Sequence, residues 1–214
     1  MSGAEDVPAF ASLGDALAAG PYGAAVEFSL PDSVFENTRT LLDAGVPTVV
    51  GATGLKLEQV ETLRATAAAR EVGCIVATNF AVGAVLMMRF AAEAAKHFAC
   101  AEIVELHETG KKDAPSGTAL HTAEGMAALA GPSLEAGTGD QPSRGLSYEG
   151  VRIHSVRLPG LVAHQEVLLG GSHELLTIRH DSYSRECFMD GVLLALRALP
   201  GLKETVVGLE NLLD

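Results

Sequence analysis

Hydrophobic positions in the first third of the chain follow two different periods. Short apolar runs bounded by Gly or Pro predict buried strands, and longer stretches with apolar residues three or four positions apart predict helices. In chain order we expect helix, strand, helix, strand, helix and strand, at residues 13–19, 24–29, 31–45, 46–50, 57–71 and 74–77. Strands that alternate with helices of this length are typical of βαβ units and a parallel sheet.

The pattern changes after residue 78. Helix, strand and helix are expected next, at residues 80–98, 101–108 and 119–129. A loop rich in Gly, Pro and Ser, residues 131–150, is followed by three strand-like runs, at residues 151–158, 162–169 and 174–180. Glycines separate these runs and favour an antiparallel meander. Two final helices are expected, at residues 184–199 and 202–213. The whole order predicts an α/β protein of two domains.

Composition and charge narrow the class of protein. Of the 214 residues, 48% are hydrophobic and 20% are charged, which is typical of a globular protein with a core. The formal net charge of −12 argues against nucleic acids and anionic membranes, because both need basic surfaces. An anionic small molecule is still a possible ligand, since a local site can be positive on an acidic protein. The longest uncharged run, residues 72–88, is too short and too interrupted to span a bilayer, and the N-terminus does not resemble a signal peptide.

The cysteines and histidines indicate neither disulfides nor a metal site. Cys74, Cys100 and Cys187 are odd in number and lie in apolar sequence, which favours buried, reduced thiols in a cytoplasmic protein. The histidines show no metal-ligand spacing, so no metal is expected. No Gly-x-Ser-x-Gly pattern occurs, which disfavours an ordinary serine hydrolase.

One segment combines several side chains that can bind ligands or transfer protons. Residues 105–118 read Glu-Leu-His-Glu-Thr-Gly-Lys-Lys-Asp-Ala-Pro-Ser-Gly-Thr, with His107 at the end of a predicted strand and Lys111 in the turn that follows. Pro-Ser-Gly-Thr then opens a helix, whose free N–H groups and dipole attract a carboxylate. Alone, each residue has an ordinary interpretation, a polar strand end or a solvated lysine. Together they favour a site that binds an anionic substrate and supplies a proton.

Two further segments follow strands of the predicted parallel sheet. They are Gly-Ala-Thr-Gly at residues 51–54 and Ala-Thr-Asn-Phe at residues 77–80. Ligands of α/β proteins bind where such strands end. Each segment also has a simpler interpretation, because a glycine pair is often only a turn and Asn79 is a good helix cap. The G-x-G-x-x-G pattern of a dinucleotide-binding sheet does not occur, so the strand near residue 24 is not expected to be the first of a complete Rossmann half.

At this point the sequence resembles a known family. Residues 105–119 are similar to the signature of 4-hydroxy-tetrahydrodipicolinate reductase (dihydrodipicolinate reductase), an NAD(P)H-dependent family of the diaminopimelate route to lysine. The resemblance extends over nearly the whole chain, through Val-Glu-Phe-Ser at 26–29, the two strand-end segments and residues 154–166. The signature is specific, whereas the strand-end segments alone are weak.

The resemblance implies a role for individual residues. His107 is implied as the acid/base residue and Lys111 as the proton donor, with Gly117 and Thr118 holding a substrate carboxylate. The nicotinamide side of NADH or NADPH is implied to lie against seven residues: Gly51, Ala52, Thr53, Ala77, Thr78, Asn79 and Phe80. A cationic Lys111 suits both attraction of a dicarboxylate and proton donation.

The resemblance also implies an architecture. Residues 1–78 and 187–214 are expected to form an incomplete Rossmann-type dinucleotide-binding domain. Residues 79–186 are expected to form an α+β substrate-binding and oligomerisation domain with a mixed, largely antiparallel sheet. The family is typically a cytoplasmic homotetramer, and the strands between residues 151 and 180 are the expected subunit contacts.

The sequence departs from the family pattern in two places. Glu108 stands where the family usually has a second histidine for substrate binding, and a carboxylate there would repel a dicarboxylate unless it is protonated or turned away. The first βαβ unit with its Gly-rich turn is absent. Because every later motif is intact, we expect that the start of the chain was assigned too late.

Two alternatives to the reductase follow from these departures. The first is a truncated, non-catalytic remnant that keeps the dicarboxylate-binding oligomerisation domain but binds dinucleotide poorly. The second is a related dehydrogenase that reduces another imine or carbonyl.

Overall fold

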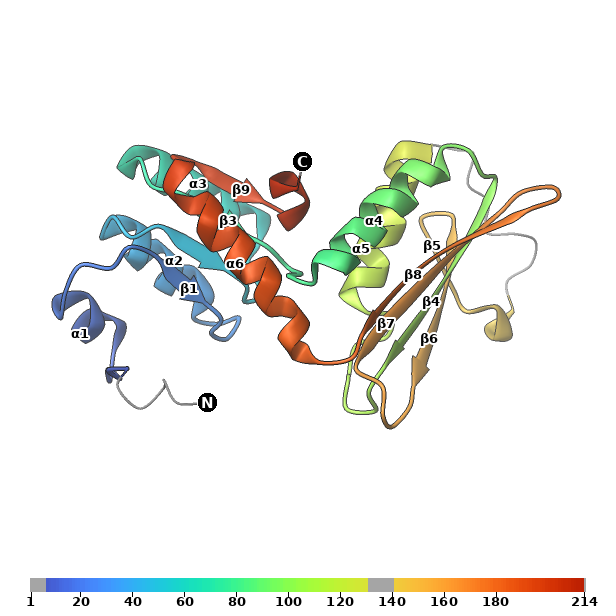
Figure 1. The fold of residues 1–214 in the computed structure, drawn as a ribbon, viewed down its shortest axis with the longest axis horizontal. Helices are drawn as coiled ribbons and strands as arrows, with labels where there is room; N and C mark the ends of the chain where they lie inside the picture. The colour runs from blue at the N-terminus through green and yellow to red at the C-terminus, as the bar shows by residue number, and fades with distance from the viewer. Residues whose placement is uncertain (1–6, 131–140, 214) are drawn as a thin grey trace. The chain divides into compact units, whose positions relative to one another are not determined.

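The computed structural model describes residues 7–130 and 141–213. The chain divides into two compact units (Figure 1), of which the first comprises Met1–Thr78 and Val192–Asp214 and the second comprises Asn79–Gly191. Part of the loop expected at residues 131–150 therefore lies outside the described residues. The remainder of it holds a 3-10 turn, Pro142–Arg144, and a strand that the sequence did not predict.

Four short parallel strands form the sheet of the first unit, in the order β1-β2-β3-β9. They are Ala25–Glu27 (β1), Thr48–Val50 (β2), Cys74–Val76 (β3) and Thr205–Val207 (β9). The helices of this unit are Leu13–Ala18 (α1), Val34–Asp43 (α2), Leu57–Arg70 (α3) and, from Val192 on, Phe188–Ala198 (α6). Because every pair of neighbouring strands is parallel, all four carboxyl ends lie along one side of the sheet, the carboxyl edge.

Apolar residues at helical spacing cover both faces of this sheet. One core cluster joins α2 and α3 to the strands through Val34, Leu42, Leu63, Ala67, Val50, Cys74 and Val76. The side chains of Val49 and Ile75 alternate to the opposite face, where they are also fully buried. Val192 and Ala195 of α6 are buried as well, and Figure 1 shows α6 crossing in front of the strands.

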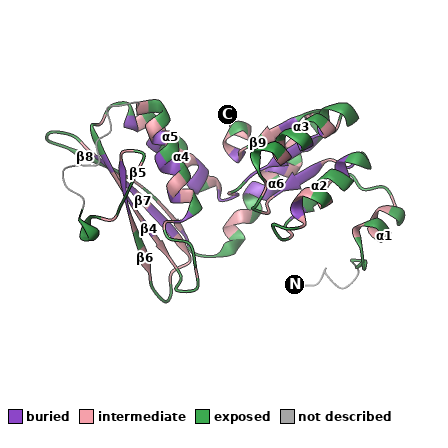
Figure 2. Cartoon of the chain, turned by 180° about the vertical axis from the view of Figure 1, so that it is seen from behind, coloured by how far each residue is buried: buried purple, intermediate pink, exposed green. Residues whose placement is uncertain are grey.

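A larger mixed sheet forms the second unit, in the order β5-β6-β4-β7-β8. Its strands are Cys100–His107 (β4), Leu146–Tyr148 (β5), Val151–Arg157 (β6), Ala163–Gly170 (β7) and Leu175–Ser182 (β8). Only β4 and β6 run parallel; the other neighbours are antiparallel. Helices Val82–Ala95 (α4) and Gly117–Ala130 (α5) lie side by side along one face in Figures 1 and 2. The core between these helices and the sheet contains Met87, Ala91, Ile103, Ala123, Met126, Ile153 and Val167.

The α/β class with a parallel sheet and a second, mixed sheet is confirmed, but three local predictions were wrong. The meander is interrupted, because β4 lies between β6 and β7; of the three predicted strands, β7 and β8 form a hairpin, whereas β6 pairs with β5 and β4. Residues 202–213 are not a helix. The β-branched run Thr-Val-Val forms β9 beside β3, Gly208 follows with a φ of 87°, and a 3-10 turn covers Leu209–Leu212.

The third correction concerns the cysteines. All three are free, but only Cys74 is buried, whereas Cys100 is exposed and Cys187 is intermediate. Cys100 is the first residue of β4, so it lies at the end of the strand instead of in the core. Burial raises the pKa of the Cys74 thiol to about 11.

Candidate active site

The carboxyl end of β4 brings a buried carboxylate next to an imidazole. Glu105 and His107 are two residues apart, so they lie on the same face of the sheet as buried Ala101 and Ile103. That face is the one covered by α4 and α5. The side chain of Glu105 is fully buried, and its Oε2 lies 2.5 Å from Nδ1 of His107.

Strand register brings an arginine to the same carboxylate. Arg157 is paired with His107 in the parallel β4–β6 ladder, so both side chains lie on one face. Its Nη1 and Nη2 each donate to Glu105 at 2.8 Å. Burial acts to raise the pKa of the Glu105 carboxyl, but hydrogen bonds from His107, Arg157 and Ser155 lower that pKa to about 2. Glu105 is therefore ionised at neutral pH.

The same two residues hold the start of α5. The Ser116 N–H donates to Glu105 Oε1 at 3.2 Å, and Arg157 Nη2 donates to the main-chain oxygen of Asp113 at 2.7 Å. Ser116 Oγ in turn accepts from the Ala119 N–H, the usual side-chain cap of a helix start. Gly117 and Thr118 form the first residues of α5. The N-terminus of this helix is thus fixed next to His107 and can attract an anion.

Thr118 takes part in a second hydrogen-bond chain. Asn79 Nδ2 donates to Thr118 Oγ1 at 3.3 Å, and Thr122 Oγ1 donates to the Thr118 carbonyl at 2.7 Å. Gln165 pairs with Glu105 in the antiparallel β4–β7 ladder, and its Nε2 donates to Thr122 Oγ1 at 2.8 Å. Asn79 Oδ1 also accepts from the N–H of Ala81, just before α4, as expected of a residue at a helix start.

Lys111 lies in the turn between β4 and α5. Its Nζ is 2.9 Å from Oδ1 of Asp113, and its side chain is 26% exposed. The hydrogen bond from Lys111 lowers the pKa of the Asp113 carboxyl. Arg157 holds the main chain of Asp113, so the position of this turn depends on the same arginine that binds Glu105.

Glu108, the residue after β4, forms an ion pair. Arg185 Nη2 donates to Glu108 Oε1 at 2.8 Å, and both side chains are largely exposed. Glu108 therefore has a cationic partner, which was not predicted from the sequence.

In the first unit, the predicted cofactor residues lie at the carboxyl edge. The N–H groups of Gly51 and Ala52 donate to the carbonyl of Glu27 at 2.9 and 3.3 Å, so they tie the turn to β1. The Ala77 N–H donates to the carbonyl of Val50. These three amides are therefore already bonded within the sheet and are not free to bind a nucleotide. Ala77 and Thr78 end the first unit, and Asn79 and Phe80 begin the second.

The carboxyl edge fits the nicotinamide end of a dinucleotide by its chemistry. Thr53 and Thr78 are exposed and offer hydroxyl groups. Glu27 is 5% exposed, and among the described residues its Oε2 has no hydrogen-bond partner. A buried acceptor without a partner is uncommon, and a carboxamide N–H or ribose hydroxyl would satisfy it.

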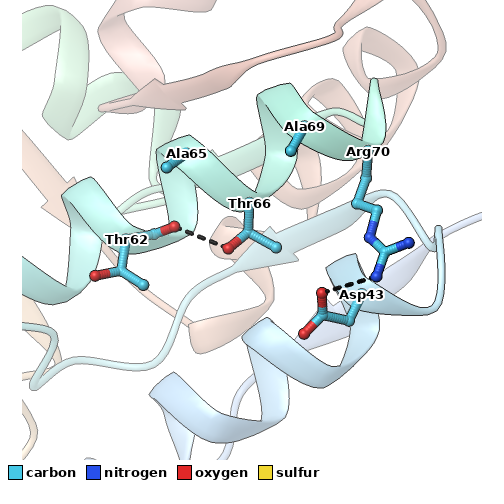
Figure 3. Close-up of a pocket in the computed structure, with 6 residues that line it drawn as sticks. All are labelled: Asp43, Thr62, Ala65, Thr66, Ala69 and Arg70. Carbon is cyan, nitrogen blue, oxygen red and sulfur yellow. Dashed lines mark hydrogen bonds and ion pairs between the residues drawn. The ribbon is translucent and has the colours of Figure 1, made fainter.

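A surface pocket of about 500 Å³ lies elsewhere in the first unit (Figure 3). Its lining comes from the end of α2 and one face of α3 and consists of Asp43, Thr62, Ala65, Thr66, Ala69 and Arg70. Arg70 and Asp43 form an ion pair at 3.3 Å. Both residues end their helices, and those helices lead into β2 and β3, so this pair lies away from the carboxyl edge. The pocket contains none of the predicted site residues.

Two classes of site are not found in the described part of the chain. No group of three His, Cys, Asp or Glu side chains there has the arrangement of a metal site. No helix within residues 7–130 and 141–213 combines the length and the apolar character that a membrane span needs.

Most of the predicted substrate residues lie on one segment of the second unit, next to residues that were not predicted. His107, Lys111, Gly117 and Thr118 lie along one continuous β4–turn–α5 segment. Glu105, Arg157 and Gln165 were missed as members of the site. Glu105 was visible as a charged residue in an apolar strand, but no local signal in the sequence identifies Arg157 or Gln165, because strand register alone brings them here.

A parallel α/β sheet of this kind can bind a dinucleotide at its carboxyl edge. In the same chain, the second unit presents an imidazole, an ammonium group and a helix start. These are groups with which an NAD(P)H-dependent oxidoreductase can bind and protonate a substrate. Comparison with family models specifies the class. Residues 1–80 match the model of the N-terminal part of dihydrodipicolinate reductase, and residues 83–213 match the model of its C-terminal part.

Individual relatives agree with the family models. 4-Hydroxy-tetrahydrodipicolinate reductase of Listeria welshimeri is 50% identical over 98% of this chain and 81% of its own length. The enzyme of that name from Moorella thermoacetica is 50% identical over 88% of this chain and 72% of its own length. A dipicolinate-bound dihydrodipicolinate reductase from Paenisporosarcina sp. TG-14 is 44% identical, with a TM-score of 0.89 over 100% of this chain and 82% of that one. This chain belongs to the dihydrodipicolinate reductase family.

Proposed function

We propose that this chain reduces 4-hydroxy-tetrahydrodipicolinate to tetrahydrodipicolinate with NADH or NADPH, in the diaminopimelate route to lysine. Membership of the family, with relatives of this name at 50% identity, supports the reaction. The observation that carries the proposal is the β4–turn–α5 segment, which presents an imidazole, an ammonium group and a helix N-terminus within twelve residues, 107–118. A dicarboxylate that must be protonated during reduction matches these three groups.

In the second unit, some residues bind the substrate and others transfer a proton. The start of α5 at Gly117 and Thr118 binds one carboxylate of the substrate through main-chain N–H groups and the Thr118 hydroxyl. Lys111 adds a positive charge, attracts the second negative group and donates the proton. His107 is the acid/base residue. Its Nδ1 faces Glu105, so proton exchange with the substrate takes place at Nε2.

We assign dinucleotide binding to residues 1–78 and 187–214 and substrate binding to residues 79–186. NADH or NADPH supplies a hydride when bound. The residues that would hold its nicotinamide end are Gly51, Ala52, Thr53, Ala77, Thr78, Asn79 and Phe80. Of these, Gly51, Ala52 and Ala77 shape the carboxyl edge, because their N–H groups bond to neighbouring strands. The hydroxyls of Thr53 and Thr78 and the free oxygen of Glu27 are the polar groups that remain for the cofactor.

Glu108 borders the substrate site as half of an ion pair. Its pairing with Arg185 reduces the negative charge that a dicarboxylate meets there. We assign the pair to substrate binding, with Arg185 offsetting the loss of the histidine that the family usually has at this position.

The proposed assembly is a homotetramer formed through the sheet of the second unit. Strand β8 is at the edge of that sheet, and its Leu175 and Leu176 are 65% and 38% exposed. An exposed apolar edge strand is a typical site of association. Light scattering coupled to gel filtration measures the mass of the assembly. Leu175→Glu puts a charge on the edge strand and should lower that mass. We place the enzyme in the cytoplasm, where amino-acid biosynthesis supplies its substrate, and cell fractionation tests this.

The activity is tested with the purified chain, freshly formed 4-hydroxy-tetrahydrodipicolinate and each nucleotide, by following the loss of reduced-nicotinamide absorbance. Calorimetry of NADH and NADPH binding separates the alternatives. The non-catalytic remnant requires binding of a pyridine dicarboxylate without saturable micromolar binding of either nucleotide. A related dehydrogenase requires turnover with another imine or carbonyl and none with this substrate.

A further inference from the structure

The carboxylate of Glu105 connects three parts of the proposed site: the imidazole of His107, Arg157 and the start of α5. It accepts from His107 Nδ1, from two nitrogens of Arg157 and from the Ser116 N–H at the start of α5. Arg157 also donates to the carbonyl of Asp113 in the turn that carries Lys111. One buried group therefore sets the position of the His107 imidazole, of the turn that carries Lys111 and of the start of α5, where the substrate carboxylate is proposed to bind.

We propose that Glu105 is a positioning residue of the reductase. It fixes the tautomer of His107, with the proton on Nδ1, and it holds the Lys111 turn and the start of α5 through Arg157 and Ser116. This inference rests on the proposed function for its kinetic consequences, but the tautomer is a property of the resting protein.

Hydrogen-bond chemistry determines the tautomer. An ionised carboxylate only accepts, so the hydrogen atom between Oε2 of Glu105 and Nδ1 of His107 belongs to the imidazole. The neutral ring then has its lone pair at Nε2, for which the described residues provide no hydrogen-bond partner. Arg157 keeps Glu105 ionised, so the proton stays on His107 and does not pass to the carboxylate. The only nitrogen of the ring that exchanges a proton with a substrate is therefore Nε2.

The buried position makes this arrangement rigid. Glu105 is fully buried, and the side chain of Arg157 is 18% exposed. Charged groups are rarely buried unless they are paired and hydrogen-bonded. The bidentate contact between Arg157 and Glu105 gives geometric specificity as well as charge compensation. The substitution Glu105→Gln keeps the side-chain volume, but it places an NH2 group next to N–H groups that also donate.

The test begins with the wild-type protein and does not require activity. Nitrogen-15 NMR of the histidine rings, with the His107 signals assigned from a His107→Asn variant, reports which ring nitrogen carries the proton. Neutral His107 is expected to be protonated at Nδ1, whereas free histidine favours Nε2. A proton on Nε2 in the neutral ring would overturn the proposal.

The kinetic test compares Glu105→Gln with a matched control, Glu124→Gln. Glu124 is an exposed carboxylate on α5, outside the site, whose Oε1 accepts from the Tyr148 hydroxyl at 2.7 Å and whose Oε2 lies 3.4 Å from Nδ1 of His121. Glu105→Gln should lower kcat roughly 100-fold, in the range that a misplaced general acid or base costs, and leave NADH affinity within threefold. Glu124→Gln should change neither quantity. A folded Glu105→Gln protein with kcat within threefold of wild type would overturn the proposal.

Two safeguards keep this result interpretable. If Glu105→Gln does not fold, Arg157→Lys is used instead, since this change keeps the charge but loses the bidentate contact. The kcat of Arg157→Lys should fall at least tenfold. A kcat within threefold of wild type would overturn the proposal. If the wild-type protein does not reduce the substrate, the proposed function fails, whereas the NMR result still decides whether Glu105 sets the tautomer.

Discussion

Glu108 Oε1 lies 2.8 Å from Nη2 of Arg185, although 77 residues separate them in the sequence. The family usually has a histidine where this chain has Glu108. Alone, a carboxylate there would oppose a dicarboxylate substrate. Paired with a guanidinium, it presents little net charge at the border of the proposed site.

The first prediction separates the charge of Glu108 from that of its partner. Arg185→Ala leaves an unpaired carboxylate near the substrate, so KM for the substrate should rise about two- to fivefold, the size of an exposed ionic interaction. The value of kcat should stay near wild type, because neither residue transfers a proton. Steady-state kinetics over a range of substrate concentrations measures both quantities.

A double variant provides the control. Glu108→Gln together with Arg185→Ala removes both charges and should return KM to near the wild-type value. If the double variant has the same raised KM as Arg185→Ala alone, Arg185 contacts the substrate directly and the role of the pair as a neutral border is wrong.

The second prediction concerns the proton donor. Lys111→Ala removes the ammonium group beside Asp113, so kcat should fall on the order of 100-fold or more. Affinity for NADH, measured by calorimetry, should be nearly unchanged because the carboxyl edge is untouched. Lys112→Ala is the matched control, since Lys112 is the neighbouring, exposed lysine. Equal turnover of the two variants would mean that another group donates the proton.

The third prediction tests the turn after β2. Gly54 has a φ of 107°, and a Cβ there would lie 2.5 Å from Cβ of Pro31. Gly54→Ala should therefore destabilise the protein by about 1–3 kcal/mol and weaken NADH binding by displacing Gly51 to Thr53. Gly20→Ala is the control, because Gly20 has open space around it and no unusual φ. Unfolding in urea and calorimetry measure the two effects, and unchanged NADH affinity would remove this turn from the cofactor site.

The sequence identified the parts of the molecule whose contacts are local. His107, Lys111 and the start of α5 lie within one short segment, so strand, turn and helix signals were enough to predict the elements that carry them. The α/β class followed in the same way from alternating periods. Arg157 could not be found by this means, because its place depends on the parallel pairing of β4 with β6, which brings it to Glu105 although the two are 52 residues apart in the sequence.

Strand order was the main feature that local patterns did not determine. Residues 151–180 contain three consecutive strands, and a meander is the simplest arrangement of such a set. Instead, β4 inserts between β6 and β7, where it buries Ala101 and Ile103 under both helices. In β9, three β-branched residues beside Cys74, Ile75 and Val76 of β3 outweighed the helical spacing of the leucines around them.

The fourth prediction follows from the ionised state of Glu105. Hydrogen bonds lower its pKa from an ordinary value of 4.5 to about 2 in the folded protein. A group with a lowered pKa contributes stability that is fully present above its unfolded pKa and is lost as pH falls toward the folded pKa. This contribution should therefore be constant above about pH 5 and disappear between about pH 4.5 and pH 2. Its size is on the order of 3 kcal/mol.

Other carboxylates also titrate in this window, so the measurement must be a difference. The free energy of unfolding in urea, followed by circular dichroism from pH 7 to pH 3, is compared between wild type and Glu105→Gln. Wild type should be the more stable protein at neutral pH, and the difference should shrink as the solution is acidified, because the variant has no proton to take up at this position. Glu124→Gln should track wild type at every pH. A difference between wild type and Glu105→Gln that stays constant down to pH 3 would mean that the carboxylate is held by its shape and not by its charge, and Arg157 would then have no electrostatic role in the site.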